Sequence, residues 1–508
     1  MALFRTDLVA EQGGDSGFNV DCLRGDLLDR GAGDGVICYG GDPMTTCNRR
    51  NFLSLIGGGL AAAQTAAAKP NVLMICVDDL NDWIGCLGGN PDSVTPNFDR
   101  LAKQCVLFTS AHCAAPLCNP SRAALLTGIR PSTSGVYQNN QPWRTSAVLA
   151  RTRTLPQHFQ DNGYKAIGGG KTFHDAYPDP DSWEEYFPSK TQQKPADPHP
   201  AKTPANGLPN PGNFDWGPIA EGDEAMGDHK VVNWAIGQMS KSHGKPLFLA
   251  AGLYRPHLPW YVPKKYFDMY PLEKITLPKV NGDDLDDVPP IGKRMAKPQT
   301  DHKLVTDHGK WKEGVQAYLA SIRFTDTELG RLLDAFEKSP MAKNAVVVLW
   351  SDHGWHLGEK LHWRKFTLWE EATHNVLMMK VPGVGIAGGR CDRPVSLMDV
   401  FPTLTDVCGL PAKKECEGVS LRPLLVNPKA KWDRPALTTY GKDNHAVRSE
   451  RWRYIRYSDG TEELYDREKD PMEWKNLAGD PKFSEVKAEH GKWLPKVNAT
   501  EIPGRGNG

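Results

Sequence analysis

Residues 72–77 read Val-Leu-Met-Ile-Cys-Val and are followed directly by Asp78 and Asp79. The six side chains are apolar without alternation, which predicts a strand buried on both faces, as in a parallel sheet covered by helices. Two further runs have the same character, 246–251 (PLFLAA) and 345–350 (AVVVLW). The three runs therefore predict a core of buried strands.

Residues 315–336 lie before the last of these runs and show a different pattern. Their apolar side chains recur at helical spacing and trace one face, which predicts an amphipathic helix. The positions are Val315, Tyr318, Leu319, Ile322, Leu329, Leu332, Leu333 and Phe336. Helices that alternate with buried strands favour a layered α/β domain.

The composition agrees with such a domain and excludes other classes of protein. The chain has 508 residues, of which 39% are hydrophobic, and its 61 Lys and Arg balance 61 Asp and Glu. These values exclude a disordered chain, a fibrous repeat and a coiled coil. Because nucleic-acid binding neutralises phosphates with Lys and Arg, a net charge of zero predicts no nucleic-acid partner.

Residues 44–68 have the layout of an export signal. The pair Arg49-Arg50 precedes a short apolar stretch, and alanines at 66–68 offer a small-residue cleavage site. This pattern predicts a twin-arginine-type signal, and therefore an exported, periplasmic or extracellular protein without a stable membrane span after signal removal. Because a signal normally starts a protein, we expect translation to begin at Met44 and residues 1–43 to be a spurious extension.

The remaining chain divides near residue 428, where the texture of the sequence changes. We expect the main domain over 69–428 and a small α+β subdomain with an antiparallel sheet over 429–508. Within the latter, residues 446–466 predict a strand pair that turns at Asp459-Gly460. Residues 175–216 are rich in Pro, Asp, Lys and Asn, which is typical of a long functional or disordered loop.

Eight cysteines follow the predicted signal, at positions 76, 86, 105, 113, 118, 391, 408 and 416. An oxidising compartment would allow disulfides, and Cys408 and Cys416 could close a short loop, although spacing alone does not establish pairing. The absence of a Cys-x-x-Cys pair argues against a structural zinc site.

Carboxylates follow two of the predicted strands. Asp78 and Asp79 come after the first run, and Asp352 and His353 come after the run at 345–350. Ligands of open α/β sheets bind beyond the carboxyl ends of the strands, so we expect these side chains to meet. Three crowded aspartates predict a divalent cation, with Ca²⁺ or Mg²⁺ favoured by the oxygens and Mn²⁺ or Zn²⁺ left open by His353.

Residues 118–128 predict a helix with defined ends. Asn119 is expected to cap it, Pro120 to occupy its first position and Gly128 to end it. Cys118 then lies at a helix N-terminus, where free N–H groups favour negative charge, and Arg122 lies one turn further on. The pattern indicates an anion site with a reactive side chain at its mouth.

Cys118-x-Pro-Ser-Arg122, followed by Leu126-Thr-Gly128, resembles the motif of the type I sulfatases of the alkaline-phosphatase-like superfamily. Other family elements follow in order over most of residues 70–480: Val77-Asp78-Asp79-Leu80, Gly170-Lys171-x-x-His174, Arg255-Pro-His257, Ser351-Asp352-His353-Gly354 with Lys365, and landmarks at 397–404 and 463–471. The iduronate-2-sulfatase branch is the most similar, and His353 stands where many other sulfatases carry asparagine.

The resemblance implies an alkaline-phosphatase-like fold, with a large, mostly parallel central sheet between helices. It implies that a maturation enzyme converts Cys118 to formylglycine, whose hydrate attacks the sulfur of a sulfated carbohydrate, with an iduronate-2-sulfate-like uronic acid as the expected substrate.

The same resemblance assigns roles to the site residues. Asp78, Asp79, Asp352 and His353 would hold one Ca²⁺ together with the formylglycine, with Mg²⁺ or Mn²⁺ as less favoured ions. Arg122 and Lys171 would orient the nucleophile, His174 would be the base for sulfate release, and His257 and Lys365 would bind sulfate and the leaving oxygen.

Two other functions are compatible with the same residues. The same scaffold serves phosphodiesterases and phosphonate monoester hydrolases, although phosphatases of the superfamily generally carry Ser or Thr as the nucleophile. A non-catalytic protein that binds sulfated glycans is the alternative from another class. Trp143, Trp355 and the loop at 175–216 are candidates for sugar contact, and the two tryptophans are equally compatible with a place in the core.

Overall fold

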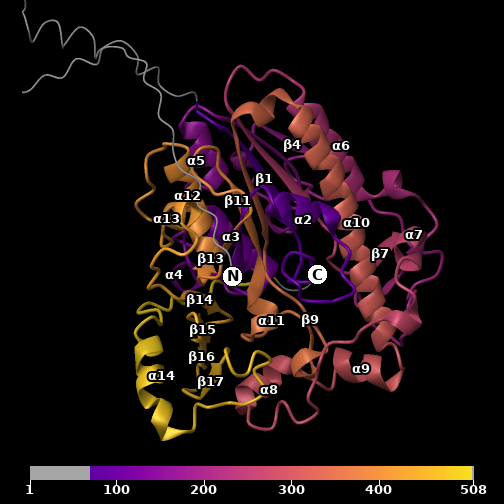
Figure 1. Ribbon diagram of the computed structural model, residues 1–508, viewed down its shortest axis with the longest axis vertical. Coiled ribbons are helices and arrows are strands. Elements are labelled where there is room, and N and C mark those ends of the chain that lie inside the picture. The colour runs from indigo at the N-terminus through magenta and orange to yellow at the C-terminus, as the bar shows by residue number, and fades with distance from the viewer. Residues whose placement is uncertain (1–68, 506–508) are drawn as a thin grey trace, which may run out of the picture. The chain divides into compact units, whose positions relative to one another are not determined.

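A computed structural model describes residues 69–505 of the protein, so the expected export signal and the residues before it lie outside the described residues. Three neighbouring strands form the centre of its largest sheet (Figure 1). Strand β1 (Asn71–Val77) pairs in parallel with β6 (Leu247–Leu253) on one side and with β8 (Ala345–Ser351) on the other. The predictions of buried strands at all three places are confirmed.

The complete sheet has nine strands in the described part of the chain. Its order is β12-β2-β11-β8-β1-β6-β3-β4, and β13 also pairs with β2. The outer strands are β2 (Val106–His112), β3 (Lys165–Gly170), β4 (Glu185–Phe187), β11 (His374–Lys380), β12 (Gly389–Cys391) and β13 (Val395–Ser396). Only β11 runs antiparallel to its neighbours, so the sheet is mostly parallel, as expected.

Helices cover both faces of this sheet (Figure 1). One face packs under α2 (Pro96–Ala102), α6 (Gly227–Met239) and α10 (Trp311–Lys338), and the other under α3 (Cys118–Thr127), α5 (Leu155–Asp161) and α12 (Val400–Val407). Side chains of β1 alternate between the two cores, with Ile75 in the first and Met74 in the second. Both faces of β1 are therefore dry, which explains its continuous apolar sequence.

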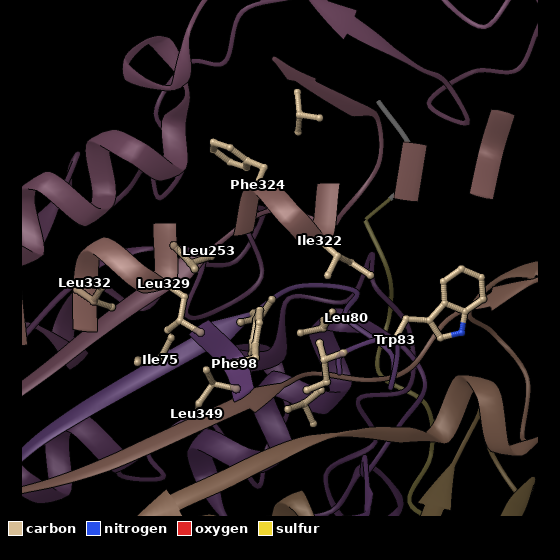
Figure 2. Close-up of a cluster of buried hydrophobic side chains, with 14 of the residues drawn as sticks. Ile75, Leu80, Trp83, Phe98, Leu253, Ile322, Phe324, Leu329, Leu332 and Leu349 are labelled. Carbon is tan, nitrogen blue, oxygen red and sulfur yellow. The ribbon is translucent and has the colours of Figure 1, made fainter. Parts of the chain in front are cut away.

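Helix α10 provides most of one apolar layer. All eight side chains predicted for its inner face are buried. Figure 2 shows Leu329 and Leu332 of this helix facing Ile75 and Leu349 of the sheet. The helical spacing in the sequence thus identified both the element and the face that it buries.

The C-terminal region contains a four-stranded antiparallel sheet. Its strands are β14 (Ala436–Thr439), β15 (His445–Arg448), β16 (Trp452–Arg456) and β17 (Glu462–Asp466), and α14 (Ser484–Gly491) follows. The predicted turn at Asp459-Gly460 joins β16 and β17, and Gly460 has a φ of 83°. The predicted strand pair was wrong in one respect, because residues 446–466 contain three strands with a further turn after Arg448. The domain boundary at 428 stays a prediction.

The other elements are short. They are β5 (Trp216–Ile219), β7 (Trp260–Pro263), β9 (His356–Leu357), β10 (Trp363–Arg364), α4 (Pro131–Ser134), α7 (Lys264–Asp268), α8 (Pro290–Ala296), α9 (Asp301–Asp307), α11 (Glu370–Thr373) and α13 (Arg422–Val426). Among the described residues, no helix has the length and apolar character to span a membrane. All eight cysteines of this part of the chain are free, so Cys408 and Cys416 do not form the short loop considered above.

Candidate active site

The carboxyl ends of neighbouring parallel strands deliver the predicted site residues to one edge of the sheet. Val77 pairs with Ser351, so Asp78 and Asp352 follow at the same level of β1 and β8. The backbone N–H of Asp79 donates to Asp352 Oδ1 at 3.1 Å. Residues that are 273 positions apart in sequence are thereby fixed next to each other.

Strands β3 and β6 deliver a second group to this edge. Lys171 follows β3, and its N–H donates to the carbonyl of Gly252 in β6 at 3.1 Å. A Cβ at Gly252 would lie 2.4 Å from the backbone of Lys171, so this close approach requires glycine. His257 follows β6 by a short loop and faces the same aspartates.

Asp79 lies in a strained turn that helix α10 supports. Its φ of 58° is in the left-handed region, which costs a non-glycine residue about 1–2 kcal/mol. The hydroxyl of Tyr318 donates to the carbonyl of Asp79 at 2.8 Å and accepts from the N–H of Asn81 at 3.0 Å. These bonds hold the turn that directs the carboxylate into the site.

Helix α3 carries Cys118 in its first turn, but its start differs from the prediction. The helix begins at Cys118 itself, preceded by Leu117, and Asn119 does not cap it. The Nδ2 of Asn119 instead donates to the carbonyls of Gln138 and Gln141 at 2.9 and 2.8 Å, its Oδ1 accepts no hydrogen bond, and Pro120 is the third residue of the helix and not the first. Gly128 ends the helix as predicted, with a φ of 76°.

The structure brings five potential ligand groups together: Asp78, Asp79, Cys118, Asp352 and His353. One ligand atom from each lies within 4.8 Å of the others, and all five residues are buried. Ca²⁺ takes oxygen ligands at about 2.3–2.6 Å, so two ligands on opposite sides of one ion lie about 5 Å apart. The spacing of the five groups therefore suits a shared cation.

Two details of hydrogen bonding also fit a cation. The oxygen Asp79 Oδ2 is buried without a hydrogen-bond partner. The ring nitrogen His353 Nδ1 lies 2.9 Å from the carbonyl of Gly354, which can only accept, so Nδ1 carries the proton and Nε2 presents a lone pair. That lone pair lies 3.3 Å from Asp79 Oδ1, an unfavourable contact that a cation between them would remove. Burial lowers the pKa of His353, which favours this neutral form.

Arg122 links two of the aspartates and the Lys171 backbone by hydrogen bonds. Its Nε donates to Asp352 Oδ2 at 2.8 Å, and its Nη2 donates to Asp78 Oδ1 at 3.1 Å. A third bond of 2.7 Å reaches the carbonyl of Lys171. Burial opposes the charge of Arg122, but the two aspartates outweigh it and raise its pKa. Arg122 therefore fixes both strand ends and remains a cation.

Two lysines face the same cluster. Lys365 donates to Asp79 Oδ1 at 2.6 Å and to Cys118 Sγ at 2.9 Å, and the Lys171 ammonium contacts Asp78 Oδ2. Burial disfavours both ammonium groups, but Asp79 and Asp78, respectively, more than compensate and raise the pKa of each. Three cations thus already balance the three aspartates. The clustering of the five ligand groups nevertheless agrees with the predicted metal site, and the identity of the ion stays a prediction.

Charge and burial also set the state of the other titratable groups. Burial opposes the charge of Asp78, but the cations Lys171 and Arg122 outweigh it and hold its pKa well below the usual value. Burial raises the pKa of Asp79, and Lys365 only partly offsets this. Burial, reinforced by Asp78, raises the pKa of the Cys118 thiol well above its usual value, so the unmodified thiol stays protonated.

His257 and His174 occupy different places relative to the cluster. His257 Nε2 lies 3.8 Å from Asp79 Oδ2, and its Nδ1 lies 2.5 Å from the carbonyl of Leu258. His174 follows Lys171 by three residues, and its buried Nδ1 has no hydrogen-bond partner. Burial, with Lys171, lowers the pKa of His174 to about 3, so it is a neutral imidazole. Its role as a base stays a prediction.

The two tryptophans considered for sugar contact lie in the core. Trp143 is 1% exposed and stacks on Phe173 with ring centres 5.4 Å apart, and Trp355 is likewise 1% exposed. Lys365 Nζ lies 5.4 Å from the Trp355 ring centre. These rings support the neighbours of His174 and the ammonium of Lys365, and neither is open to a sugar.

Sequence reasoning missed Tyr254, which directly precedes the Arg255-Pro-His257 element. Its ring lies 5.3 Å from Lys171 Nζ and 4.7 Å from Lys194 Nζ, and its hydroxyl donates to Asp175. The only signal in the sequence was its position between a buried strand and His257.

Comparison with known proteins places this site in a family context. A sulfatase family model matches residues 70–410, and a model named for the C-terminal part of N-sulphoglucosamine sulphohydrolase matches 358–500. The chain is 43% identical to a sulfatase of Formosa agariphila, covering 86% of this chain and 88% of that protein. It is 32% identical to iduronate 2-sulfatase of Mus musculus, covering 72% and 75%. The fold also resembles a phosphonate monoester hydrolase of Agrobacterium radiobacter, with a TM-score of 0.69, 23% identity and coverage of 83% and 94%.

Proposed function

The chain belongs to the sulfatase family, and from this premise we propose that it is an exported enzyme that hydrolyses sulfate esters of carbohydrates with a formylglycine at position 118 and a divalent cation. Ca²⁺ is the proposed ion because three of the five ligand groups are carboxylates. An iduronate-2-sulfate-like uronic acid is the proposed substrate, supported by the relative named iduronate 2-sulfatase.

One observation carries the proposal. Cys118 Sγ lies at the N-terminus of α3, 3.4 Å from His353 Nε2 and 2.9 Å from the Lys365 ammonium, inside the cluster of aspartates. The reacting side chain and the expected ion site therefore share one buried space. A helix N-terminus with two lysines nearby also suits an incoming sulfate, because all of these groups attract anions.

The proposed reaction follows from these positions. A hydroxyl of the hydrated side chain at 118 attacks sulfur, the carbohydrate oxygen leaves with a proton, and loss of a proton from the second hydroxyl then expels sulfate and restores the aldehyde. When bound, a divalent cation favours the deprotonated form of the nucleophile.

Residues of the chain hold the side chain at 118 and the aspartates in place and supply positive charge for the sulfate. Lys365 holds the side chain at 118 by a direct hydrogen bond, and Arg122 keeps Asp78 and Asp352 in register. His257 and Lys365 border the same space and would bind sulfate oxygens and the leaving oxygen, and Lys171, which contacts Asp78, would help to orient the nucleophile. Donors aimed at developing charge typically contribute about 10²–10³-fold each.

Phosphonate or phosphodiester hydrolysis is the second candidate, because a solved phosphonate monoester hydrolase shares the fold. The cluster alone would accommodate either tetrahedral anion. Turnover of an aryl sulfate, an aryl phosphate diester and an aryl phosphonate monoester separates the candidates, and we expect the sulfate ester to be preferred.

Mass spectrometry of the peptide across residue 118 tests the nucleophile directly. We expect active enzyme to carry an aldehyde or its hydrate at this position, and fully active enzyme with an intact thiol would contradict the proposal. Removal of divalent cations should abolish turnover, and added Ca²⁺ should restore it. A non-catalytic glycan-binding protein would instead bind sulfated glycans without releasing sulfate after this maturation.

A further inference from the structure

A cavity of about 440 Å³ adjoins the residues that we place around the scissile sulfate. Residues 191–197 form one wall, and the rest of the lining consists of Asp175, His199, Arg255, Pro259 and Tyr261. Asp175 directly follows His174, and Arg255 precedes His257 by two positions. Close neighbours of the proposed catalytic histidines therefore line the cavity, together with part of the loop at 175–216 that the sequence offered for sugar contact.

Gln193 connects this wall of the cavity to the segment that carries His174. Its Oε1 accepts from the N–H of Phe173 at 3.1 Å, and its Nε2 donates to the carbonyl of His174 at 3.2 Å. Gln193 is itself buried. The position of Lys194, the next residue, is thereby coupled to that of His174 by a rigid contact.

Tyr254 links the cavity to the catalytic centre. Lys194 Nζ lies 4.7 Å from the centre of its ring, and Lys171 Nζ lies 5.3 Å from the same centre. Cations are attracted to an aromatic face at these distances. One ammonium group, on Lys171, contacts Asp78 of the cluster, whereas the other lines the cavity. Both ammonium groups therefore lie close to the same aromatic ring.

The positive charge of Lys194 is only partly compensated. Its ion pair with Asp197 Oδ2 is long, at 3.6 Å. The same oxygen accepts from Arg255 at 3.0 Å, and the other oxygen of Asp197 accepts from the N–H of Gly227 at 2.7 Å. Burial lowers the pKa of Lys194, and Arg255 lowers it further, as expected for an ammonium without a full counter-charge.

The other charged groups of the cavity, Arg255 and Asp175, form hydrogen bonds with residues other than Lys194. Arg255 already uses three of its five N–H groups, because besides Asp197 it donates to the carbonyls of Tyr261 and His257 at 3.2 Å each. Asp175 accepts from the Tyr254 hydroxyl, and burial raises its pKa. Lys194 thus retains spare donor capacity directed at the cavity.

We propose that this cavity binds a second anionic group of the carbohydrate substrate, a carboxylate or a further sulfate, through Lys194. The inference rests on the proposed function and adds to it Lys194 and this cavity as the site that recognises the second negative charge of the substrate. A hydrogen bond to a charged group contributes about 1.5–3 kcal/mol, which corresponds to about 10- to 100-fold in binding.

The test compares kcat/KM for a 2-sulfated uronic acid, for its carboxyl-reduced analogue and for an uncharged aryl sulfate. We expect Lys194→Ala to reduce the preference for the uronic acid over the aryl sulfate by about 10- to 100-fold. Lys194→Arg should retain most of the preference, and Lys190→Ala, which changes an exposed lysine on the same loop, should leave it intact. If the anion is the carboxylate, the carboxyl-reduced analogue should be insensitive to Lys194→Ala. A disulfated neutral sugar tests the second sulfate in the same way.

The outcomes separate this inference from the function on which it rests. Wild-type enzyme that cleaves sulfate esters but keeps its preference in Lys194→Ala would overturn the inference alone. Equal losses on the uronic acid and the aryl sulfate would also overturn it, because Lys194 would then act on the reaction generally. Mature wild-type enzyme without activity on any sulfate ester would remove the proposed function, and this inference with it.

Discussion

Two buried charge clusters in this protein have similar composition and different organisation. At the strand ends, Asp79 Oδ2 is buried without a hydrogen-bond partner. Near the C-terminal sheet, Glu370 and Glu473 face Arg448, Arg453 and Arg467, and each of the four carboxylate oxygens has an arginine or backbone partner. We call the second cluster closed because its carboxylates are fully paired, and the first cluster open because it leaves a carboxylate oxygen available to a ligand. An unpaired carboxylate oxygen beside a reactive side chain therefore marks the first cluster as the candidate functional site, whereas a buried atom without a partner is not sufficient alone, since Arg467 Nε of the second cluster is one as well.

The largest expected effect is on activity at the open cluster. Cys118→Ala should reduce sulfate-ester turnover on the order of 10⁴-fold or more, as for other catalytic groups that act as a unit. Folding should persist, because the substitution removes one small side-chain atom. Turnover with an aryl sulfate and thermal unfolding measure the two effects.

Cys113→Ala is the matched control for that substitution. Cys113 is equally buried, lies five residues earlier and directs its thiol to the carbonyl of Ala372 at 3.8 Å. We expect this variant to keep its activity per folded molecule. Equal inactivation of both variants would mean that any buried cysteine of this region is needed for folding.

At the closed cluster the expected effect is on stability. Arg453→Met removes the guanidinium that donates to Glu473 Oε1 at 2.6 Å and contacts Glu370, and it leaves both carboxylates without their main partner. Breaking a buried ion pair in this way costs about 3–5 kcal/mol. Urea unfolding measures the loss, and kcat of the remaining folded enzyme should be unchanged. A large fall in kcat with normal stability would reverse the roles of the two clusters.

The sequence predicted the open cluster better than the closed one for a physical reason. Asp78, Asp79, Asp352 and His353 directly follow apolar strands, and a parallel sheet brings strand ends together. Arg453 lies 83 positions from Glu370 and 20 from Glu473, with no spacing that marks either pair. Side-chain contacts across a fold depend on packing that no local pattern encodes.

The same limit explains the errors at the ends of elements. Asn119 is a favoured cap residue and precedes a proline, yet its amide nitrogen donates to Gln138 and Gln141, about 20 residues away. The three-stranded region at 446–466 has one turn with a clear Asp-Gly signal and one without. Lys194 lies in a loop that lacks periodicity, so its place beside Tyr254 could be found only in three dimensions.

Stabilisation by a divalent cation distinguishes the open cluster from the closed one without a measurement of catalysis. We expect Ca²⁺ to stabilise the wild-type protein by about 2.7 kcal/mol when its concentration is 100 times the dissociation constant. Asp79→Asn should weaken this stabilisation, because it neutralises one ligand group, and Arg453→Met should retain it relative to its own lower baseline. Thermal unfolding with and without Ca²⁺ measures both. Equal stabilisation of wild type and Asp79→Asn would argue against an ion at this cluster.

The smallest expected effect is the response of the closed cluster to acid. Burial opposes the charge of Glu370, but Arg467, Arg448 and Arg453 outweigh it and hold its pKa well below the usual value. The unfolded chain therefore binds a proton at Glu370 first, near pH 4.3, and stability falls as the pH drops from there towards the lower pKa of the folded state. One such group contributes up to about 1.4 kcal/mol per pH unit in that window. Urea unfolding at pH 5.5 and 3.5 should therefore show a steeper loss in wild type than in Glu370→Gln, which lacks this proton-binding site. Identical losses would mean that the arginines do not hold Glu370 ionised, and the closed cluster would then lose the charge pairing that separates it from the open one.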